Sequence, residues 1–256
     1  MKDAPRYVIL SDLHIPDHDE KSLALVMRFI ADFKPDFIYL LGDQVNFTKI
    51  SKYEQDPRYH VDLADEIKQA KKFLAEITKV GKRANRNVQF VWFDGNHEAR
   101  LVHWLNKNAA NLAELEVDDM PLVSIQNLLE LKKLGIRYVA YPEVDVQYEV
   151  AFTHGQTIRS KSGYTGHANM EKYGRSGFSG HTHRMSFTSK TQMGKTKWWI
   201  ETGCLCNLAP TPSYTNYPDW MQGFAIAEYD PETEQLYGAQ IPIVDHSFRF
   251  NGKTYK

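Results

Sequence analysis

The chain has 256 residues, and its 31 Lys and Arg nearly balance its 32 Asp and Glu, so the formal net charge is -1. This balance excludes a protein that binds nucleic acid over its whole surface, although a local basic patch stays open. Hydrophobic residues make up 42% of the chain, which is enough to bury a sizeable core.

The first half of the chain alternates predicted strands with predicted helices. Near-continuous apolar runs at 7–10, 37–41 and 88–93 predict three strands that are covered on both faces. Between them, apolar residues recur at helical spacing over 20–33 and 61–80, which predicts two amphipathic helices. This alternation is typical of an α/β fold with a largely parallel sheet.

The second half begins with a predicted helical insertion at about 101–134, formed by helices at 101–115 and 124–134. Beyond it the chain is mostly β, with one further helix near 165–173. The predicted strands are 137–140, 145–153, 175–179, 185–192, 196–201, 223–229 and 236–243. Strand–helix alternation followed by a β-rich half predicts two packed sheets with helices outside, in a single domain over 1–256.

Short polar motifs follow several of these strands directly. They are Asp12-Leu13-His14, Gly42-Asp43, Gly95-Asn96-His97-Glu98, His154-Gly155 and Gly180-His181-Thr182-His183. In open α/β sheets, ligands bind beyond the carboxyl ends of the strands. The motifs offer two Asp, one Asn and four His as candidate ligands, without sulfur. This set suits Mn²⁺, Fe or Zn²⁺ and suits Ca²⁺ poorly.

The number of candidate ligands indicates two metal ions. Seven ligands exceed what one tetrahedral ion needs, whereas two ions that share one carboxylate would use all of them. Two ions about 3.5–4 Å apart can clamp the attacking and leaving oxygens of a displacement at phosphorus. Water between them becomes hydroxide near neutral pH. The ligand set therefore predicts a phosphoester hydrolase.

The order of the five motifs resembles the calcineurin-like metallophosphoesterase superfamily, over residues 8–183. The resemblance implies a four-layer α/β/β/α sandwich of two mixed β-sheets flanked by helices. It also implies two divalent metal ions, for which we predict Mn²⁺ ahead of Fe, Zn²⁺ or Ni²⁺. It places Asp12, His14 and His183 on one ion, Asn96, His154 and His181 on the other, and Asp43 between the two. His97 would not bind metal but would protonate the leaving oxygen or stabilise the transferred group.

One departure from the pattern bears on function. Protein phosphatases of this superfamily have Gly-Asp-x-x-Asp-Arg-Gly, whereas this chain has Asn46 and Phe47 at the second Asp and the Arg. An amide cannot stabilise an imidazolium as a carboxylate would, so a protein-phosphatase assignment is weakened. What orients His97 stays open, with Asp94 and Glu98 as the alternatives.

Three basic residues are candidates for binding substrate. Arg100 follows the Gly-Asn-His-Glu motif and can reach a phosphate oxygen, or it is an ordinary surface arginine. Arg159 and Lys161 lie in the segment after His154, which can hold an anionic substrate or be a solvated loop. Only about seventy residues follow His183, so we expect a compact pocket suited to a nucleotide, a chain end or a small ester. The helical insertion can set specificity or mediate dimerisation, and the oligomeric state stays open.

Three functions are compatible with this pattern. The first is a phosphodiesterase for a nucleotide or nucleic acid, which the missing phosphatase Asp and Arg favour. The second is a phosphomonoesterase for a phosphoprotein or a small phosphate, which Glu98 favours because many nuclease-like members carry Asp there. The third is a metal-binding scaffold without catalysis, against which the intact Asp43, Asn96 and His97 argue.

The cysteines and the N-terminus bear on where the protein works. Cys204 and Cys206 are the only cysteines, too close for an easy disulfide and too few for a zinc knuckle. No stretch of the chain is long and apolar enough to span a bilayer, and the N-terminus has no secretory hydrophobic segment. We therefore expect a cytoplasmic protein without a membrane partner.

Overall fold

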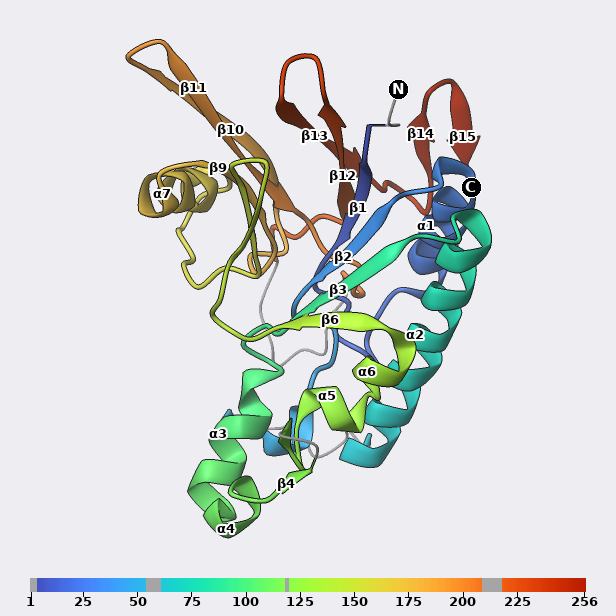
Figure 1. Ribbon diagram of the computed structural model, residues 1–256, viewed down its shortest axis with the longest axis vertical. Helices are drawn as coiled ribbons and strands as arrows, with labels where there is room; N and C mark the ends of the chain where they lie inside the picture. Colours follow the sequence, from blue (N-terminus) through green and yellow to red (C-terminus); the bar gives the residue numbers. More distant parts are fainter. Residues whose placement is uncertain (1–3, 54–60, 118–119, 209–217) are drawn as a thin grey trace.

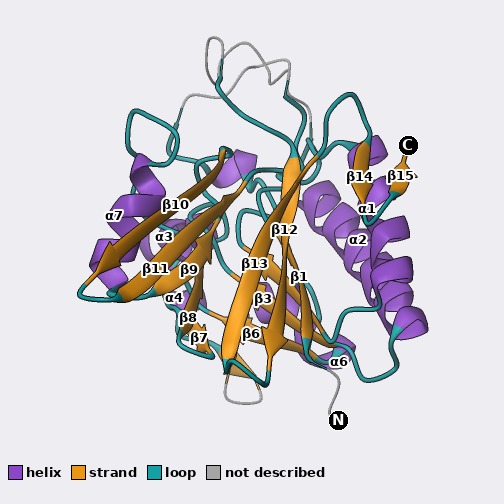
Figure 2. Ribbon diagram, turned by 90° about the horizontal axis from the view of Figure 1, so that it is seen from above, coloured by secondary structure: helices purple, strands orange, loops and turns teal. Residues whose placement is uncertain are grey.

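The computed structural model describes residues 4–53, 61–117, 120–208 and 218–256. Its larger sheet has six strands in the order β13-β12-β1-β2-β3-β6 (Figures 1 and 2). These strands are β1 Arg6–Leu10, β2 Phe37–Leu41, β3 Gln89–Phe93, β6 Ile136–Val139, β12 Gly223–Asp230 and β13 Gln235–Pro242. Strands β1, β2, β3 and β6 are parallel, and β12 runs antiparallel to both β1 and β13.

The second sheet has five strands in the order β10-β11-β9-β8-β7. They are β7 Asp145–Gln147, β8 Val150–Thr153, β9 Ser176–Ser179, β10 Met185–Gln192 and β11 Lys195–Thr202. The prediction of one strand over 145–153 is wrong, because the chain turns back at Tyr148 and Glu149, where φ is 50° and 62°. Since β9 is parallel to β8 and β11 while β7 and β10 are antiparallel to their neighbours, both sheets are mixed.

Alternate side chains of the central strands face two different layers. Val8 and Ile38 pack against helices α1 (Glu20–Phe33) and α2 (Leu63–Ala84). Ile9 and its neighbours on the other face pack against Phe152 and Phe178 of the second sheet. On the far side of that sheet, Met170 of α7 (Tyr164–Tyr173) packs against Ala151 and Trp199. The layers therefore follow the predicted order α/β/β/α, and the strands are apolar on both faces because each face is covered.

Helix α1 agrees with its predicted bounds because local signals define both of its ends. The Asp19 side chain accepts a hydrogen bond from the Ser22 N–H at 2.8 Å, which caps the first turn. Lys34 ends the helix with φ at 53°, directly before Pro35. In contrast, α2 continues past Gly81, where the sequence predicts its end, to Ala84.

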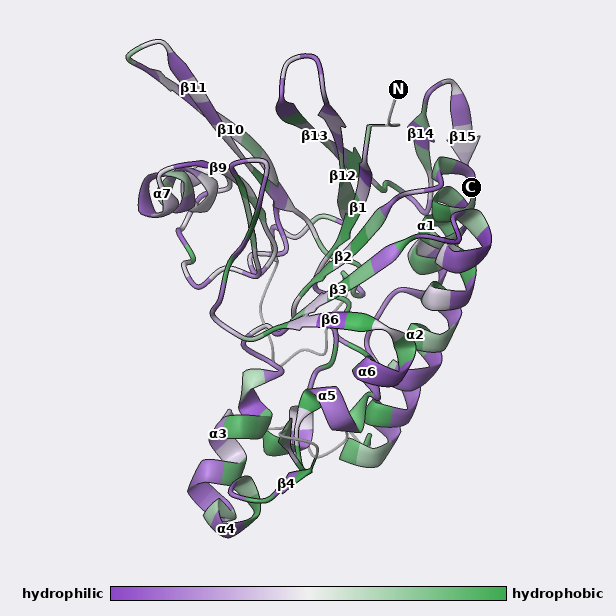
Figure 3. Cartoon of the chain, in the orientation of Figure 1, coloured by the Kyte–Doolittle hydropathy of each residue, from purple (hydrophilic) through white to green (hydrophobic). Residues whose placement is uncertain are grey.

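Short elements connect β3 to β6 (Figure 1). They are α3 Ala99–Asn108, α4 Ala110–Ala113, β4 Glu116–Val117, β5 Met120–Pro121, α5 Ile125–Leu128 and α6 Leu131–Leu134. The two predicted helices of this segment are thus four shorter ones, and hydrophobic and hydrophilic residues alternate along α3 and α4 (Figure 3). A single domain with a helical insertion at 101–134 stays a prediction.

Two small elements complete the described fold. The 3₁₀ helix η1, Thr48–Ile50, follows the β2 motif. A C-terminal hairpin of β14 (Phe248–Phe250) and β15 (Lys253–Tyr255), absent from the predicted strands, packs its aromatic rings against Phe29 of α1. None of the described helices is long and apolar enough to cross a membrane.

Candidate metal centre

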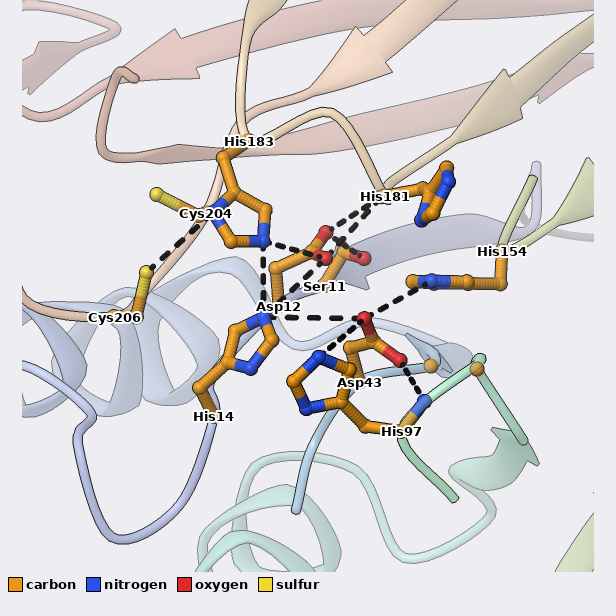
Figure 4. Close-up of polar contacts among 12 residues, drawn as sticks. Ser11, Asp12, His14, Asp43, His97, His154, His181, His183, Cys204 and Cys206 are labelled. Carbon is orange, nitrogen blue, oxygen red and sulfur yellow. Dashed lines mark hydrogen bonds and ion pairs between the residues drawn. The ribbon is translucent and has the colours of Figure 1, made fainter. Parts of the chain in front are cut away.

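All seven predicted ligands lie just beyond the carboxyl ends of strands. Asp12 and His14 follow β1, Asp43 follows β2, Asn96 follows β3, His154 follows β8, and His181 and His183 follow β9. Several hydrogen bonds join the loops of the two sheets, among them two that involve backbone groups. The His181 N–H donates to Asp12 Oδ2 at 2.9 Å, and His154 Nδ1 lies 2.7 Å from the Leu41 carbonyl. Figure 4 shows six of these side chains, Asn96 not being labelled, near the carboxyl ends of strands from both sheets.

The Asp43 carboxylate lies in the middle of this group. Its Oδ1 accepts a hydrogen bond from the His97 N–H at 2.8 Å. Its Oδ2 lies 3.3 Å from His154 Nε2 and 3.9 Å from the Nε2 atoms of His14 and His97. Burial raises the pKa of Asp43, but the imidazoles of His154 and His97 outweigh burial and hold it well below its ordinary value. One oxygen thus faces both halves of the ligand set, as a shared ligand must.

The Asp12 carboxylate is held in one orientation. Ser11 Oγ donates to its Oδ2 at 2.5 Å, and the His181 N–H binds the same oxygen. Its Oδ1 is directed toward His183 Nε2 at 3.3 Å and His14 Nε2 at 3.8 Å. The His181 N–H is shared with Oδ1 at the longer distance of 3.2 Å, so Oδ1, which faces the two imidazoles, is the less occupied oxygen and the better placed for a cation.

The surroundings of His154 require a positive charge between its ring and its neighbours. Its Nδ1 donates to the Leu41 carbonyl, so in the neutral ring Nε2 carries a lone pair. That Nε2 faces two oxygens, Asn96 Oδ1 at 3.1 Å and Asp43 Oδ2 at 3.3 Å. Burial lowers the pKa of His154, but Asp43 raises it to about 9, which is how a proton would supply this charge. A divalent cation would supply it equally well, and Asp43, His154 and His181 offer ligand atoms within 4.8 Å of one another.

A second set of donors is arranged in the same way. Asn46 Nδ2 donates to Asp17 Oδ2 at 2.7 Å, which directs the amide oxygen of Asn46 toward His14 Nδ1 at 2.8 Å. His14 Nδ1 then carries the proton, and its Nε2 lone pair faces His183 Nε2 at 2.9 Å. Asp12, His14 and His183 offer atoms within 4.8 Å of one another. The residues present therefore fit two cation positions that share Asp43.

The backbone that carries these ligands is in a conformation that L-residues rarely adopt. Five ligand residues have positive φ: Asp12 (54°), His14 (54°), Asp43 (51°), His181 (73°) and His183 (58°). Such conformations cost of order 1–3 kcal/mol each and cluster at functional sites. The chain is also tightly packed here, since a Cβ on Gly95 would lie 2.1 Å from Asp43 Oδ1 and one on Gly180 would lie 1.8 Å from Ser11 Oγ. The surrounding fold therefore holds the ligands in place.

The His97 ring is held by Asn46 and Arg100. Its Nδ1 lies 3.1 Å from the Asn46 carbonyl, and Arg100 Nη2 lies 2.8 Å from its Nε2. Arg100 Nη1 also donates to the Asn46 carbonyl at 2.7 Å. Burial lowers the pKa of His97 well below its ordinary value, and the positive charges of His14 and Arg100 lower it further against the effect of Asp43. Since an arginine can only donate, these contacts favour a neutral ring with its proton on Nδ1.

Neither acidic residue that the sequence suggests for orienting His97 contacts its ring. Asp94 accepts hydrogen bonds from Trp92 Nε1 at 2.9 Å and from the Tyr138 hydroxyl at 2.5 Å. Glu98 accepts hydrogen bonds from four backbone N–H groups, those of Asp43, Gln44, Val45 and Gly95, at 2.8–2.9 Å. The Asn46 carbonyl orients His97 instead, and Glu98 ties the loop after β2 to the loop after β3.

The structure brings only one of the three predicted substrate-binding residues to the centre. Arg100 contacts His97, as described above. Arg159 and Lys161 are exposed on the segment before α7, where Lys161 Nζ lies 5.7 Å from the Tyr164 ring centroid. Among the described residues, neither of these two side chains contacts a predicted ligand.

Four residues that the sequence reasoning did not place at the site lie against it. Ser11 and Asn46 contact ligands through hydrogen bonds, Cys206 Sγ lies 4.0 Å from His183 Nδ1, and the Trp220 ring centroid lies 4.3 Å from that of His183. Only Asn46 carries a sequence signal, because it stands where phosphatases have an acidic residue. The other contacts join segments that are distant in sequence, or depend on side-chain direction.

Comparisons with known proteins identify the family of the chain. The family model of calcineurin-like phosphoesterases matches residues 5–185, and the chain therefore belongs to this family. It is a metal-dependent phosphoesterase, in a family that uses two divalent metal ions. The gene 54 proteins of Mycobacterium phages D29 and L5 are each 28% identical to it over 98% of both chains.

Two solved structures are similar at low sequence identity. Vps29 of Entamoeba histolytica, complexed with Zn²⁺, is 12% identical, with a TM-score of 0.48 over 98% of this chain and 99% of that one. A dimetal phosphatase of Danio rerio is 11% identical, with a TM-score of 0.40 over 89% of this chain and 93% of that one.

Proposed function

We propose that this chain is a phosphodiesterase for a nucleotide or a nucleic-acid end, with Mn²⁺ as its preferred metal. The proposal rests on the residues at positions 46 and 47, where protein phosphatases have Asp and Arg. Asn46 uses its side chain to orient His14, and Phe47 is buried and apolar where phosphatases have an arginine. A monoester dianion loses a cationic partner at that position, whereas a diester carries only one negative charge. Arg100 supplies a guanidinium beside His97.

The geometry supports a role for each of these side chains. Asp12, His14 and His183 would hold one cation, Asn96, His154 and His181 the other, and Asp43 both. Bound divalent cations would supply Lewis-acid activation of water and of the phosphoryl oxygens. The Arg100 guanidinium would place positive charge beside the phosphoryl group. His97, held through Nδ1 by the Asn46 carbonyl, would face a reacting oxygen with Nε2 once the substrate takes Arg100 from that atom.

Glu98 does not favour a phosphomonoesterase in the structure as it does in the sequence. Both of its carboxylate oxygens are used by backbone N–H groups, so it does not face the substrate. The identity of this residue therefore does not distinguish diester from monoester hydrolysis.

A pair of chromogenic substrates tests the proposal directly. We expect the Mn²⁺-reconstituted protein to hydrolyse bis-p-nitrophenyl phosphate faster than p-nitrophenyl phosphate. Asp43→Asn removes the shared carboxylate and should abolish turnover, whereas Asp245→Asn, at an exposed position with a similar positive φ of 48°, should leave it unchanged. A clear preference for the monoester would overturn the diesterase proposal. Full metal occupancy without turnover of either ester would instead favour the scaffold.

A further inference from the structure

Helix α3 begins beside the catalytic candidates and leads away from them (Figure 1). Arg100, in its first turn, reaches back to His97 Nε2 and to the Asn46 carbonyl. At 100° per residue, Trp104 and Lys107 lie within about 40° of Arg100 around the helix axis. At a rise of about 1.5 Å per residue they follow Arg100 by about 6 Å and about 10 Å. One face of α3 therefore continues outward from the metal centre.

This face is basic and aromatic, and it is open to solvent. Trp104 is 40% exposed and Lys107 is also exposed, whereas Leu101 and Leu105 on the neighbouring face are buried. The helix contains no Asp or Glu, so its own side chains place no negative charge beside Lys107. An exposed indole between two cationic side chains matches the alternation of bases and phosphates in a nucleic-acid strand.

The neighbouring segment repeats this combination. The 3₁₀ helix η1 packs beside α3, and two residues beyond it come Lys52 and Tyr53. Lys52 Nζ lies 5.3 Å from the Tyr53 ring centroid, and this ring is 66% exposed. Helix α3 and the segment after η1 thus each offer an aromatic ring and a cation.

We infer that this face of α3 is a binding track for single-stranded nucleic acid that extends from the scissile phosphate at the metal centre. A base stacks on the Trp104 ring and a neighbouring phosphate pairs with Lys107. The inference rests on the proposed diesterase function and adds a substrate class to it. A protein partner fits this face less well, because the exposed apolar Val102 lies on the opposite side of the helix, about 160° from Arg100.

Binding of a labelled oligonucleotide tests the track separately from turnover. The probe is fluorescein-labelled dT12, and its anisotropy is measured with the full chain in EDTA so that it is not cleaved. Because stacking of one base on an aromatic ring contributes about 1–3 kcal/mol, Trp104→Ala should weaken binding about 5- to 150-fold. Trp104→Phe should restore most of the affinity, and Val102→Ala, on the opposite side of the same helix, is the matched control.

The salt dependence of the same binding tests Lys107. Each neutralised phosphate of a single strand contributes about 0.7 to the slope of log K against log salt, so Lys107→Gln should lower this slope by about that amount. A merely structural role for Lys107 would not change the slope.

Each outcome has a defined meaning. Equal dT12 affinity for Trp104→Ala and Val102→Ala, with folding confirmed by circular dichroism, would overturn the track. So would a Trp104→Ala variant that changes only the oligomeric state in size-exclusion chromatography, since the face would then bind a second copy. If the wild-type protein fails to hydrolyse bis-p-nitrophenyl phosphate but its dT12 binding depends on Trp104 and Lys107, the track stands and the diesterase proposal fails.

Discussion

Replacing Glu98 with glutamine tests how the two ligand-bearing loops are held together. The carboxylate is fully buried, with Oε1 bound to the N–H groups of Gln44 and Val45 and Oε2 bound to those of Asp43 and Gly95. A glutamine keeps one of the two oxygens and replaces the other by an NH₂ group. Two buried N–H groups then lose their acceptor and face another donor.

The expected cost follows from these two lost hydrogen bonds. A buried donor left without a partner costs about 1–3 kcal/mol, so Glu98→Gln should lower the free energy of unfolding by about 2–6 kcal/mol. For a protein of this size, 1 kcal/mol corresponds to about 2–4 °C in Tm, so the Tm of Glu98→Gln should fall by at least about 4 °C. Urea and thermal unfolding of the metal-loaded protein would measure it, with Glu76→Gln on the exposed face of α2 as the matched control.

Metal removal should make the loss of unfolding free energy in Glu98→Gln smaller. Burial, together with the negative charges of Asp43 and Asp94, raises the pKa of Glu98 to about 8. Cations bound at Asp43 would reduce this repulsion and keep Glu98 ionised. In EDTA Glu98 holds a proton near neutral pH, so a glutamine replaces a side chain that is already neutral and costs less. A metal-loaded Glu98→Gln protein with a free energy of unfolding within about 0.5 kcal/mol of the control, the range of ordinary surface substitutions, would refute the reasoning.

Three further predictions concern the packing, the metal and the pH dependence. Gly95→Ala should lower the metal content measured by elemental analysis, because its Cβ would lie 2.1 Å from Asp43 Oδ1; two bound ions per chain would contradict this. Chelation should lower the Tm of the wild type, since a ligand at 100 times its Kd stabilises by about 2.7 kcal/mol, and an unchanged Tm would argue against tight binding. Burial raises the pKa of Glu66 to about 7, although a hydrogen bond from the Thr48 N–H acts to lower it. The folded state therefore keeps a proton on Glu66 that the unfolded state releases near the ordinary pKa of 4.5. The free energy of unfolding should therefore fall as pH rises through this interval, by at most about 3 kcal/mol, and Glu66→Gln should remove that fall; an equally steep fall in the variant would exclude Glu66 as its source.

Much of the fold could be predicted because its signals are local. The strands β1, β2 and β3 and helix α1 follow from apolar periodicity and from capping residues within each segment. The sequence does not predict the turn at Tyr148 or the C-terminal hairpin, because strands of three or four residues, stabilised by pairing or by packing on α1, are too short to show a periodicity of their own.

For the candidate site, too, one part follows from the sequence and another part only from the tertiary structure. The order of the Asp, Asn and His motifs is a property of the sequence by itself, and it was enough to predict the fold class and the family. The ligand set that it indicates stays a prediction. Which atoms face one another was decided only by the tertiary structure. Asn46 directs His14 with its side chain and His97 with its carbonyl, and Glu98 binds backbone rather than His97. These contacts join loops that follow different strands in two sheets. The tautomers of the histidine rings and the positive φ angles of the predicted ligands therefore depend on packing between segments that are distant in sequence.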